Sequence, residues 1–175
     1  MSFYRTVFEL IDLRSFSNLW FWIALAVAWS STSHWVLGVP YDMVNRARRQ
    51  GGQALIDLED IARINVNRLL YIARTAGTWL MALLFFLWTA LLTLGWVYRV
   101  EFAQALFLLG APLSLVGLLS VATARKIEAG EDRGEALQHR LLTHRFVTQL
   151  IGIVAIFVTA MWGMYQNVEM SVFGH

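Results

Sequence analysis

The residues of this sequence best able to do chemistry are its histidines and one run of hydroxyl side chains. Residues 29–35 spell WSSTSHW, so four hydroxyl side chains precede His34 inside an otherwise apolar stretch. His144 lies just before another apolar stretch, which begins at Phe146. Two imidazoles on different helices can bind a haem iron between them, so His34 and His144 form a candidate haem-binding pair. We favour the alternative that they are structural or interfacial histidines.

Acidic residues also gather between positions 128 and 135, where they could suggest a metal site. Their spacing is irregular and Arg133 interrupts them, so we predict a solvated charged loop and no metal. The chain has no cysteine, which excludes thiolate ligands, disulfides and cysteine nucleophiles. It also lacks the common motifs of hydrolases, metalloproteases and nucleotide-binding enzymes. We therefore predict no cofactor, and an enzyme is the least favoured class.

Composition places these side chains in a membrane protein. The 175 residues are 58% hydrophobic and 15% charged, and they include eight Trp and eleven Phe. A soluble domain has about 25% charged residues. Four uncharged runs reach the roughly 20 residues that one spanning helix needs. The fold class predicted is all-α, an integral membrane protein with four transmembrane helices plus amphipathic interfacial helices. The expected spans are 19–39, 77–98, 102–124 and 146–167.

The distribution of basic residues predicts the orientation. Segments 40–76 and 125–145 hold eleven of the fourteen Lys and Arg residues. Cytoplasmic connections are enriched in these residues, so both segments should be cytoplasmic and both termini external. We predict a multi-pass protein of a bacterial inner membrane with periplasmic termini. A net charge of +2 gives no reason to expect nucleic acid as a partner.

The segments outside the spans have amphipathic patterns. Residues 1–18 predict a helix in the outer interface, and 168–175 an external tail. In 40–76, a short helix after Pro40 carries Arg46, Arg48 and Arg49, which should bind anionic lipid headgroups. Glu59 and Arg63 can pair along a second helix. That helix either continues into the second span or bends at Gly77 and lies on the membrane.

Small residues recur at helical spacing in three spans, where they should let neighbouring helices approach closely. The stripes are Ala26, Ser30 and Ser33 in the first span, Gly110, Ser114 and Gly117 in the third, and Gly152, Thr159 and Gly163 in the fourth. Trp29 and Trp88 fall near mid-membrane, which favours contact with protein over anchoring at the interface. The hydroxyl run of WSSTSHW is then interpreted as part of a packing seam.

One stretch resembles a known family. Residues 5–44, RTVFELIDLRSFSNLWFWIALAVAWSSTSHWVLGVPYDMV, are similar to uncharacterised bacterial membrane proteins that are often labelled a component of the Suf iron–sulfur assembly complex. The resemblance extends along the chain and assigns no catalytic residues. It implies a membrane tether for cytoplasmic machinery, a role that the 40–76 connection could serve.

The spans contain no Asp, Glu, Lys or Arg, which argues against a proton-coupled transporter. We predict a non-enzymatic accessory or scaffold subunit that packs against other membrane helices, in a homo-oligomer or a larger complex. Its expected partners are membrane lipids and those helices. The alternatives, in order, are an oligomeric channel or small-solute pore and a haem-binding membrane protein.

Overall fold

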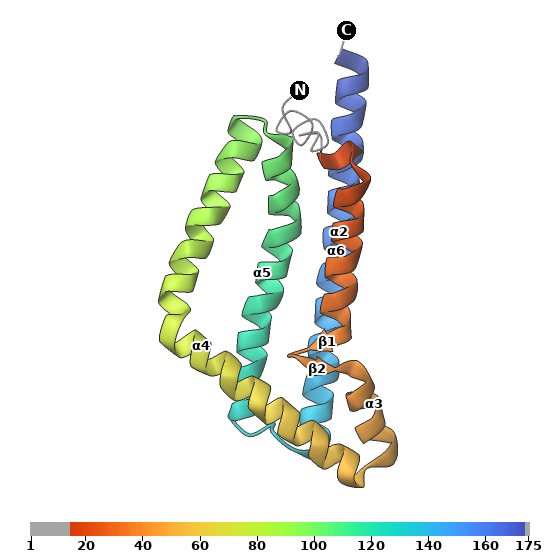
Figure 1. Cartoon of the computed structure of the whole chain (residues 1–175), viewed down its shortest axis with the longest axis vertical. Coiled ribbons are helices and arrows are strands. Elements are labelled where there is room, and N and C mark those ends of the chain that lie inside the picture. Colours follow the sequence, from red (N-terminus) through yellow and green to blue (C-terminus); the bar gives the residue numbers. More distant parts are fainter. Residues whose placement is uncertain (1–14, 174–175) are drawn as a thin grey trace, which may run out of the picture.

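The computed structural model describes residues 15–173, which are almost entirely helical (Figure 1). The elements in chain order are η1 (Ser15–Ser17), α2 (Leu19–His34), β1 (Trp35–Val36), β2 (Val39–Pro40), α3 (Tyr41–Gln50), α4 (Gly52–Leu92), η2 (Thr93–Val97), α5 (Glu101–Glu128) and α6 (Gly134–Phe173). Of the predicted interfacial helix over 1–18, all but the last residues lie outside the described part of the chain.

Three helices are long and apolar enough to cross a membrane: Gly52–Val97, Glu101–Glu128 and Gly134–Glu169. They confirm the prediction of a helical, multi-pass membrane protein. The remaining candidate, α2, has 16 residues and spans about 24 Å at 1.5 Å per residue. It is shorter than the predicted span of 19–39.

The early end of α2 has a local cause. Instead of continuing to Val39, the chain turns after His34 into a two-stranded antiparallel hairpin, in which Val36 pairs with Val39. Leu37 and Gly38 form its two-residue turn with φ of 53° and 75°. Positive φ at both central positions is the geometry that matches the twist of a tight hairpin. Asn65 of α4 holds the turn, since its amide Nδ2 donates to the Gly38 carbonyl at 3.1 Å.

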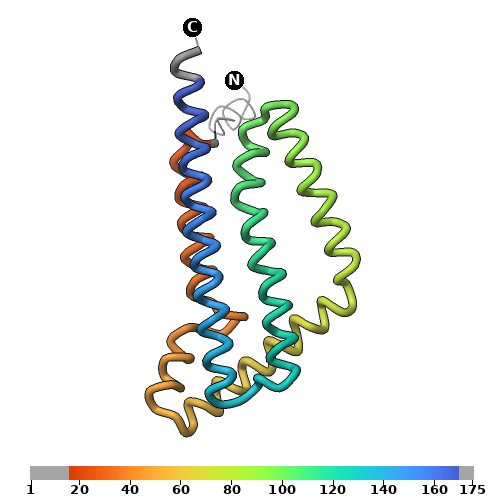
Figure 2. The backbone as a smooth tube through the Cα atoms, turned by 180° about the vertical axis from the view of Figure 1, so that it is seen from behind, coloured from red at the N-terminus to blue at the C-terminus, as the bar shows by residue number. Residues whose placement is uncertain are grey.

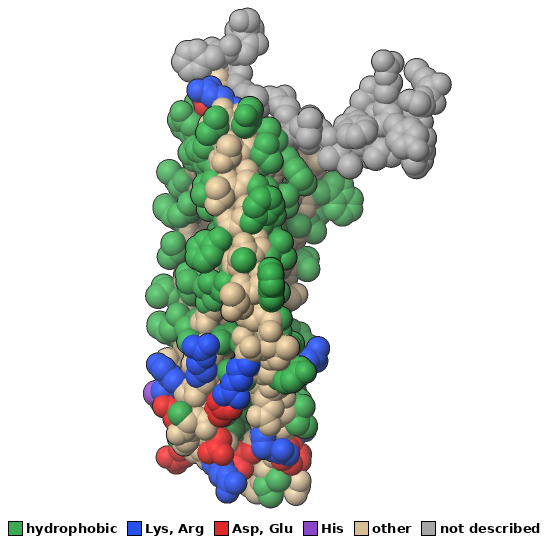
Figure 3. Space-filling view, turned by 90° about the vertical axis from the view of Figure 1, so that its left-hand side faces the viewer, with side chains coloured by type: hydrophobic (Ala, Val, Ile, Leu, Met, Phe, Trp, Pro, Cys, Tyr) green, Lys and Arg blue, Asp and Glu red, His purple; other side chains and the backbone are tan. Residues whose placement is uncertain are grey.

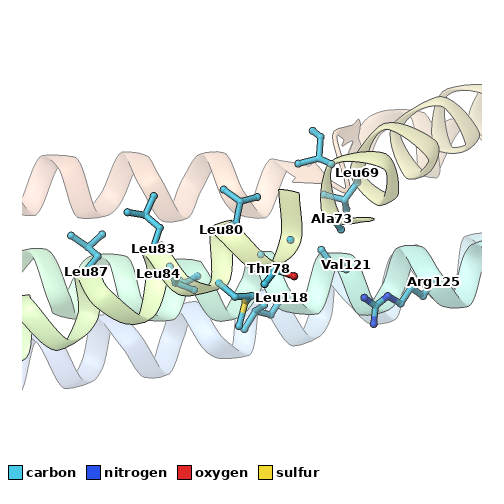
Figure 4. Close-up of a pocket in the computed structure, with 15 residues that line it drawn as sticks. Leu69, Ala73, Thr78, Leu80, Leu83, Leu84, Leu87, Leu118, Val121 and Arg125 are labelled. Atoms are coloured by element: carbon cyan, nitrogen blue, oxygen red, sulfur yellow. The ribbon is translucent and has the colours of Figure 1, made fainter. Parts of the chain in front are cut away.

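The helix α4 is continuous over 41 residues, and it bends. Figure 1 shows one part running across the base of the molecule and the other running up beside α5. Figure 4 places Leu69 and Ala73 on one side of the bend and Leu80 and Leu83 on the other. We call residues 52–73 the first arm and residues 80–92 the second arm. Both sequence alternatives therefore hold in part, because the helix is unbroken and also changes direction.

The connection predicted over 125–145 is far shorter in the structure. The helix α5 continues to Glu128 and α6 begins at Gly134, so only residues 129–133 lie outside helices. The positive φ of Gly130 and Gly134, 135° and 54°, permits the reversal there. Residues 168–173, predicted as a tail, continue α6.

The helices form an open bundle. The helix α2 runs beside α6 in both views, α5 lies next to α6, and the second arm of α4 is outermost (Figures 1 and 2). Residues 15 and 173 lie at the same end of the bundle. Figure 3 shows most of the blue and red side chains of that face gathered at the other end, and mainly green side chains over the rest, apart from a small blue and red group near the top.

Two clusters of buried side chains stabilise this arrangement. The smaller lies between α2, α5 and α6 and contains Leu25, Trp29, Val116 and Ala155. The larger lies at the charged end, where the hairpin, α3 and the first arm of α4 pack on the ends of α5 and α6. Its twelve buried residues are Val36, Val39, Val44, Ala47, Leu58, Ala62, Val66, Leu70, Ala124, Ile127, Leu137 and Leu141. The best-packed part of the described chain is therefore its charged end.

Candidate functional site

The two histidines of the haem hypothesis have different neighbours. His144 is buried on α6 and faces α5, where the Thr123 Oγ1 lies 3.1 Å from Nδ1 and the Ser120 Oγ lies 3.4 Å from Nε2. His34 is exposed, and its ring lies edge-to-face against Trp35. Both nitrogens of His144 are thus occupied by hydroxyl groups. Nothing in this geometry favours a shared iron between the two rings.

Arg145, one residue after His144, makes the contact between α6 and the end of α2. Its Nε donates to the Ser33 carbonyl at 3.3 Å, and its guanidinium lies 3.5 Å from the centre of the Tyr41 ring. The guanidinium over the ring is a cation–π contact. Arg145 therefore joins the end of the WSSTSHW segment to α6, although the sequence pattern placed this arginine only in a charged connection.

Three of the glycines predicted to lie at helix contacts have a tryptophan ring packed against them. A Cβ on Gly152 would lie 2.8 Å from the Trp29 ring, and one on Gly110 would overlap the Trp88 ring. A Cβ on Gly163 would meet Trp22 at 3.2 Å. In each case a tryptophan from a neighbouring helix occupies the space that the glycine leaves free.

The remaining predicted packing residues behave differently. Thr159 is fully buried, and its hydroxyl donates to the Ala155 carbonyl at 2.7 Å. Ser114 donates to Gly110 of its own helix at 2.8 Å. Gly117 faces open space instead of a neighbouring helix.

The stripe of Ala26, Ser30 and Ser33 does not form the packing face of α2. Ala26 and Ser30 are exposed, and Ser33 takes part through its backbone carbonyl. The face that packs against the bundle carries Leu25 and Trp29. Large side chains of α2 can pack here because Gly152 and Gly163 of α6 leave room for tryptophan rings.

Ion pairs and one helix cap join the elements of the charged end. The Arg74 Nη2 lies 2.6 Å from the Glu128 Oε2, which connects α4 to α5. Arg140 binds Glu131 through two nitrogens and connects α6 to the 129–133 loop. The hydrogen bond from Arg140 holds the pKa of the Glu131 carboxyl below its ordinary value. This side chain is partly exposed, so water screens the pair.

Glu59 does not pair with Arg63 as the spacing predicted. Its Oε1 accepts a hydrogen bond from the Gly134 backbone N–H at 2.8 Å, at the beginning of α6. A carboxylate there satisfies a free N–H and interacts favourably with the helix dipole. Arg63 pairs instead with Asp60, at 3.1 Å.

The helix α3 exposes the three arginines that were predicted to bind lipid headgroups. Arg46, Arg48 and Arg49 are all exposed, whereas Val44 and Ala47 are buried against the larger cluster. The helix ends at Gln50, before the positive φ of Gly51 and Gly52. The basic face of α3 is therefore free for an anionic surface.

The first arm of α4 also exposes apolar side chains away from the cluster. Ile64 is 58% exposed and Tyr71 is 69% exposed, although both lie at the charged end. They share a helix face with Asp60 and Arg68, since these positions are three or four residues apart. This set, Asp60, Ile64, Arg68 and Tyr71, is called the arm face below.

A cavity of about 750 Å³ lies at the bend of α4 (Figure 4). Leucines of both arms and the α5 residues Ser114, Gly117, Leu118 and Val121 line it. Arg125 is the charged residue of the lining and lies at one end. We call it the bend cavity. Its size falls within the range of small-molecule pockets.

One buried polar residue, Gln104, was not predicted from the sequence. Gln104 is 3% exposed; its Nε2 donates to the Gly95 carbonyl at 2.7 Å, and its Oε1 accepts from Trp162 Nε1 and Gln166 Nε2, both at 2.9 Å. It thereby joins η2, α5 and α6 at the end opposite the charges. An uncharged polar residue in an apolar run was the available signal, because a buried amide needs partners.

Among residues 15–173, no group of three or more His, Asp and Glu side chains is placed to hold a metal ion. Comparison of the chain with protein-family models, with curated proteins and with solved structures finds no match.

Proposed function

We propose that this protein is a non-enzymatic scaffold subunit of a bacterial inner membrane, which holds a partner through the arm face. The observation that carries the proposal is the position of the larger cluster. A bundle that only crossed the membrane would have no need for a core of twelve buried side chains at its charged end. This core instead holds the first arm of α4 in a defined direction across the ends of α5 and α6.

The composition of the arm face suits a protein partner. Interfaces are enriched in Tyr and Arg, and a few such residues supply most of the binding energy. Tyr71 and Arg68 are exposed side by side with Ile64, while charges of both signs surround them. The resemblance of residues 5–44 to Suf-labelled membrane proteins fits a tether for cytoplasmic machinery, since the charged end is expected to be cytoplasmic.

Within this proposal α2 is the fourth span, and α3 and the first arm lie at the inner interface. Trp22 and Trp29 of α2 contact Gly163 and Gly152, which lie within the apolar part of α6. A helix packed along a membrane-crossing helix over this length crosses with it. Both termini are then periplasmic.

Photo-crosslinking in cells tests the partner. Replacing Tyr71, and separately Ile64, by p-benzoylphenylalanine should give one covalent adduct of the same mass, because both positions face the same partner. The same substitution at Phe86, on the second arm, should not give that adduct. Gentle extraction followed by native mass spectrometry should show the partner at a fixed ratio.

Two results would overturn the proposal. One is that neither the Tyr71 variant nor the Ile64 variant forms a covalent adduct, so that both purify as monomers. The other is an identical set of adducts from Tyr71 and Phe86, which would mean that the arm face contacts its surroundings without preference.

A further inference from the structure

The bend cavity has a shape and a charge that the scaffold proposal does not use. It exists because α4 and α5 touch at two places and separate between them. Toward one end Trp88 lies over Gly110; at the charged end Leu70, Ala124 and Ile127 belong to the larger cluster. Between these contacts α4 bends away, and the helices present small residues to the gap.

The two glycines of the lining leave this gap open. A Cβ added to Gly77 or to Gly117 would have no atom within 4 Å. The gap is also open at its side, since Leu80 and Leu83 are 49% and 62% exposed. In a membrane protein this side meets hydrocarbon chains, and a cavity of this size without an occupant would forfeit packing contacts.

A single charge gives the cavity a polarity. Arg125 is exposed at the end nearest the charged residues, and Figure 4 shows its guanidinium directed toward the other lining residues. It takes part in none of the ion pairs found among residues 15–173, whereas the neighbouring Arg74 is paired with Glu128. From Ser114 to Arg125 the lining rises about 16 Å along α5.

We propose that the bend cavity binds one anionic phospholipid, with an acyl chain between α4 and α5 and the headgroup phosphate on Arg125. The positive charge of Arg125 indicates that the ligand is anionic. A neutral helix of another protein would leave the Arg125 guanidinium without an anionic partner. A phosphate accepts hydrogen bonds from two of the guanidinium N–H groups. Thr78, which lies between the two arms of α4, adds a hydroxyl group to the lining.

The site is distinct from the basic face of α3. Arg46, Arg48 and Arg49 are exposed on α3, which contributes no residue to the lining of the bend cavity, so they would attract an anionic surface at a separate place. The bend cavity would hold one lipid at a defined place. The proposal does not depend on a partner at the arm face.

Native mass spectrometry of the full chain, with phosphatidylglycerol or phosphatidylcholine added in turn, tests the site. Wild type should retain one phosphatidylglycerol about fivefold more tightly than phosphatidylcholine, the ratio that one charge near the surface provides. Arg125→Gln should abolish this preference while leaving one lipid bound. Arg133→Gln removes a charge from the loop outside the cavity and should keep the preference.

A second variant separates the cavity from the charge. Gly117→Phe adds a ring in the open space and should remove the bound lipid of either kind, whereas Leu106→Phe on an exposed part of α5 should not. Circular dichroism monitors folding, and Arg125→Gln carries the test alone if Gly117→Phe fails to fold. Equal retention of the two lipids by wild type would overturn the proposal, as would equal loss of preference in Arg125→Gln and Arg133→Gln.

Discussion

At the residue scale, the bundle packs by placing tryptophan rings over glycines. Trp22, Trp29 and Trp88 each lie on a helix different from that of the glycine they cover. An aromatic ring brings a large contact area, and the absence of a Cβ lets it approach the helix backbone. The result is a set of specific contacts between apolar helices that hydrophobicity alone would not select.

Gly152→Ala tests this arrangement. The added Cβ would lie 2.8 Å from the Trp29 ring, so we expect a loss of about 1–3 kcal/mol, typical of an overfilled core. Gly117→Ala is the matched control, since its Cβ meets open space and alanine is the better helix former. Thermal unfolding in detergent should show a lowered Tm for the first variant and an unchanged or raised Tm for the second. Equal effects would contradict the packing argument.

Gln104→Met probes the buried amide. Methionine fills a similar volume and leaves the Gly95 carbonyl and the Trp162 indole N–H without their partner, which should cost about 1–3 kcal/mol. The half-buried Gln149 of α6 provides a control, and Gln149→Met should change stability by less. The comparison is made by thermal melts of the two variants beside wild type.

The sequence predicted some of these residue contacts and could not predict others. Periodic small residues identified α6 glycines that do lie at helix contacts, because spacing reveals which residues share a face. Spacing does not reveal the neighbour. In α2 the large residues Leu25 and Trp29 face the bundle, and the small stripe beside them is exposed. His34 and His144 look equivalent in sequence, but only the neighbouring helix decides which ring is buried.

At the scale of elements, the ends of the helices determine the fold more than their interiors do. The apolar runs predicted four spans, but the first of them, α2, ends five residues early because of a hairpin whose turn includes Leu37 at positive φ. A leucine rarely adopts that conformation, so no sequence pattern predicts it. Likewise the charges of 125–145 predicted a solvated connection over that whole range, whereas Glu59 of α4 and Arg140 of α6 hold a connection of only five residues.

The Glu131–Arg140 pair makes that connection sensitive to acid. The pKa of Glu131 is lowered in the folded protein, so the pair contributes its full stabilisation above the ordinary glutamate pKa. That contribution is lost as the pH falls through the lowered value. The Tm difference between wild type and Glu131→Gln should therefore shrink below about pH 4. Melts from pH 7 to pH 3 measure this difference, and a difference that stays constant over that range would contradict the prediction.

At the scale of the whole molecule, both described ends of the chain lie opposite the charged end. The absence of cysteine makes this arrangement accessible to labelling, because each introduced thiol is the only one. Asn18→Cys and Asp42→Cys flank α2, and Asn167→Cys lies near the end of α6.

In intact cells, a membrane-impermeant maleimide should label Asn18→Cys and Asn167→Cys but not Asp42→Cys. After the inner membrane is opened, Asp42→Cys should react as well. This pattern would establish that α2 crosses the membrane and that the charged end is cytoplasmic. Labelling of Asn18→Cys and Asp42→Cys from the same side would show instead that α2 does not cross.

The unbroken course of α4 has a thermodynamic consequence. One hydrogen-bonded helix carries the arm face on its first arm and lines the bend cavity with both arms. A change in the angle between the arms must then alter the room between α4 and α5. A ligand that fits the bend cavity better at one angle shifts the population of molecules toward that angle. If a partner also binds the arm face better at that angle, each of the two increases the affinity for the other by the same factor. The bend of α4 would thus couple the binding of a ligand in the bend cavity to the binding of a partner at the arm face.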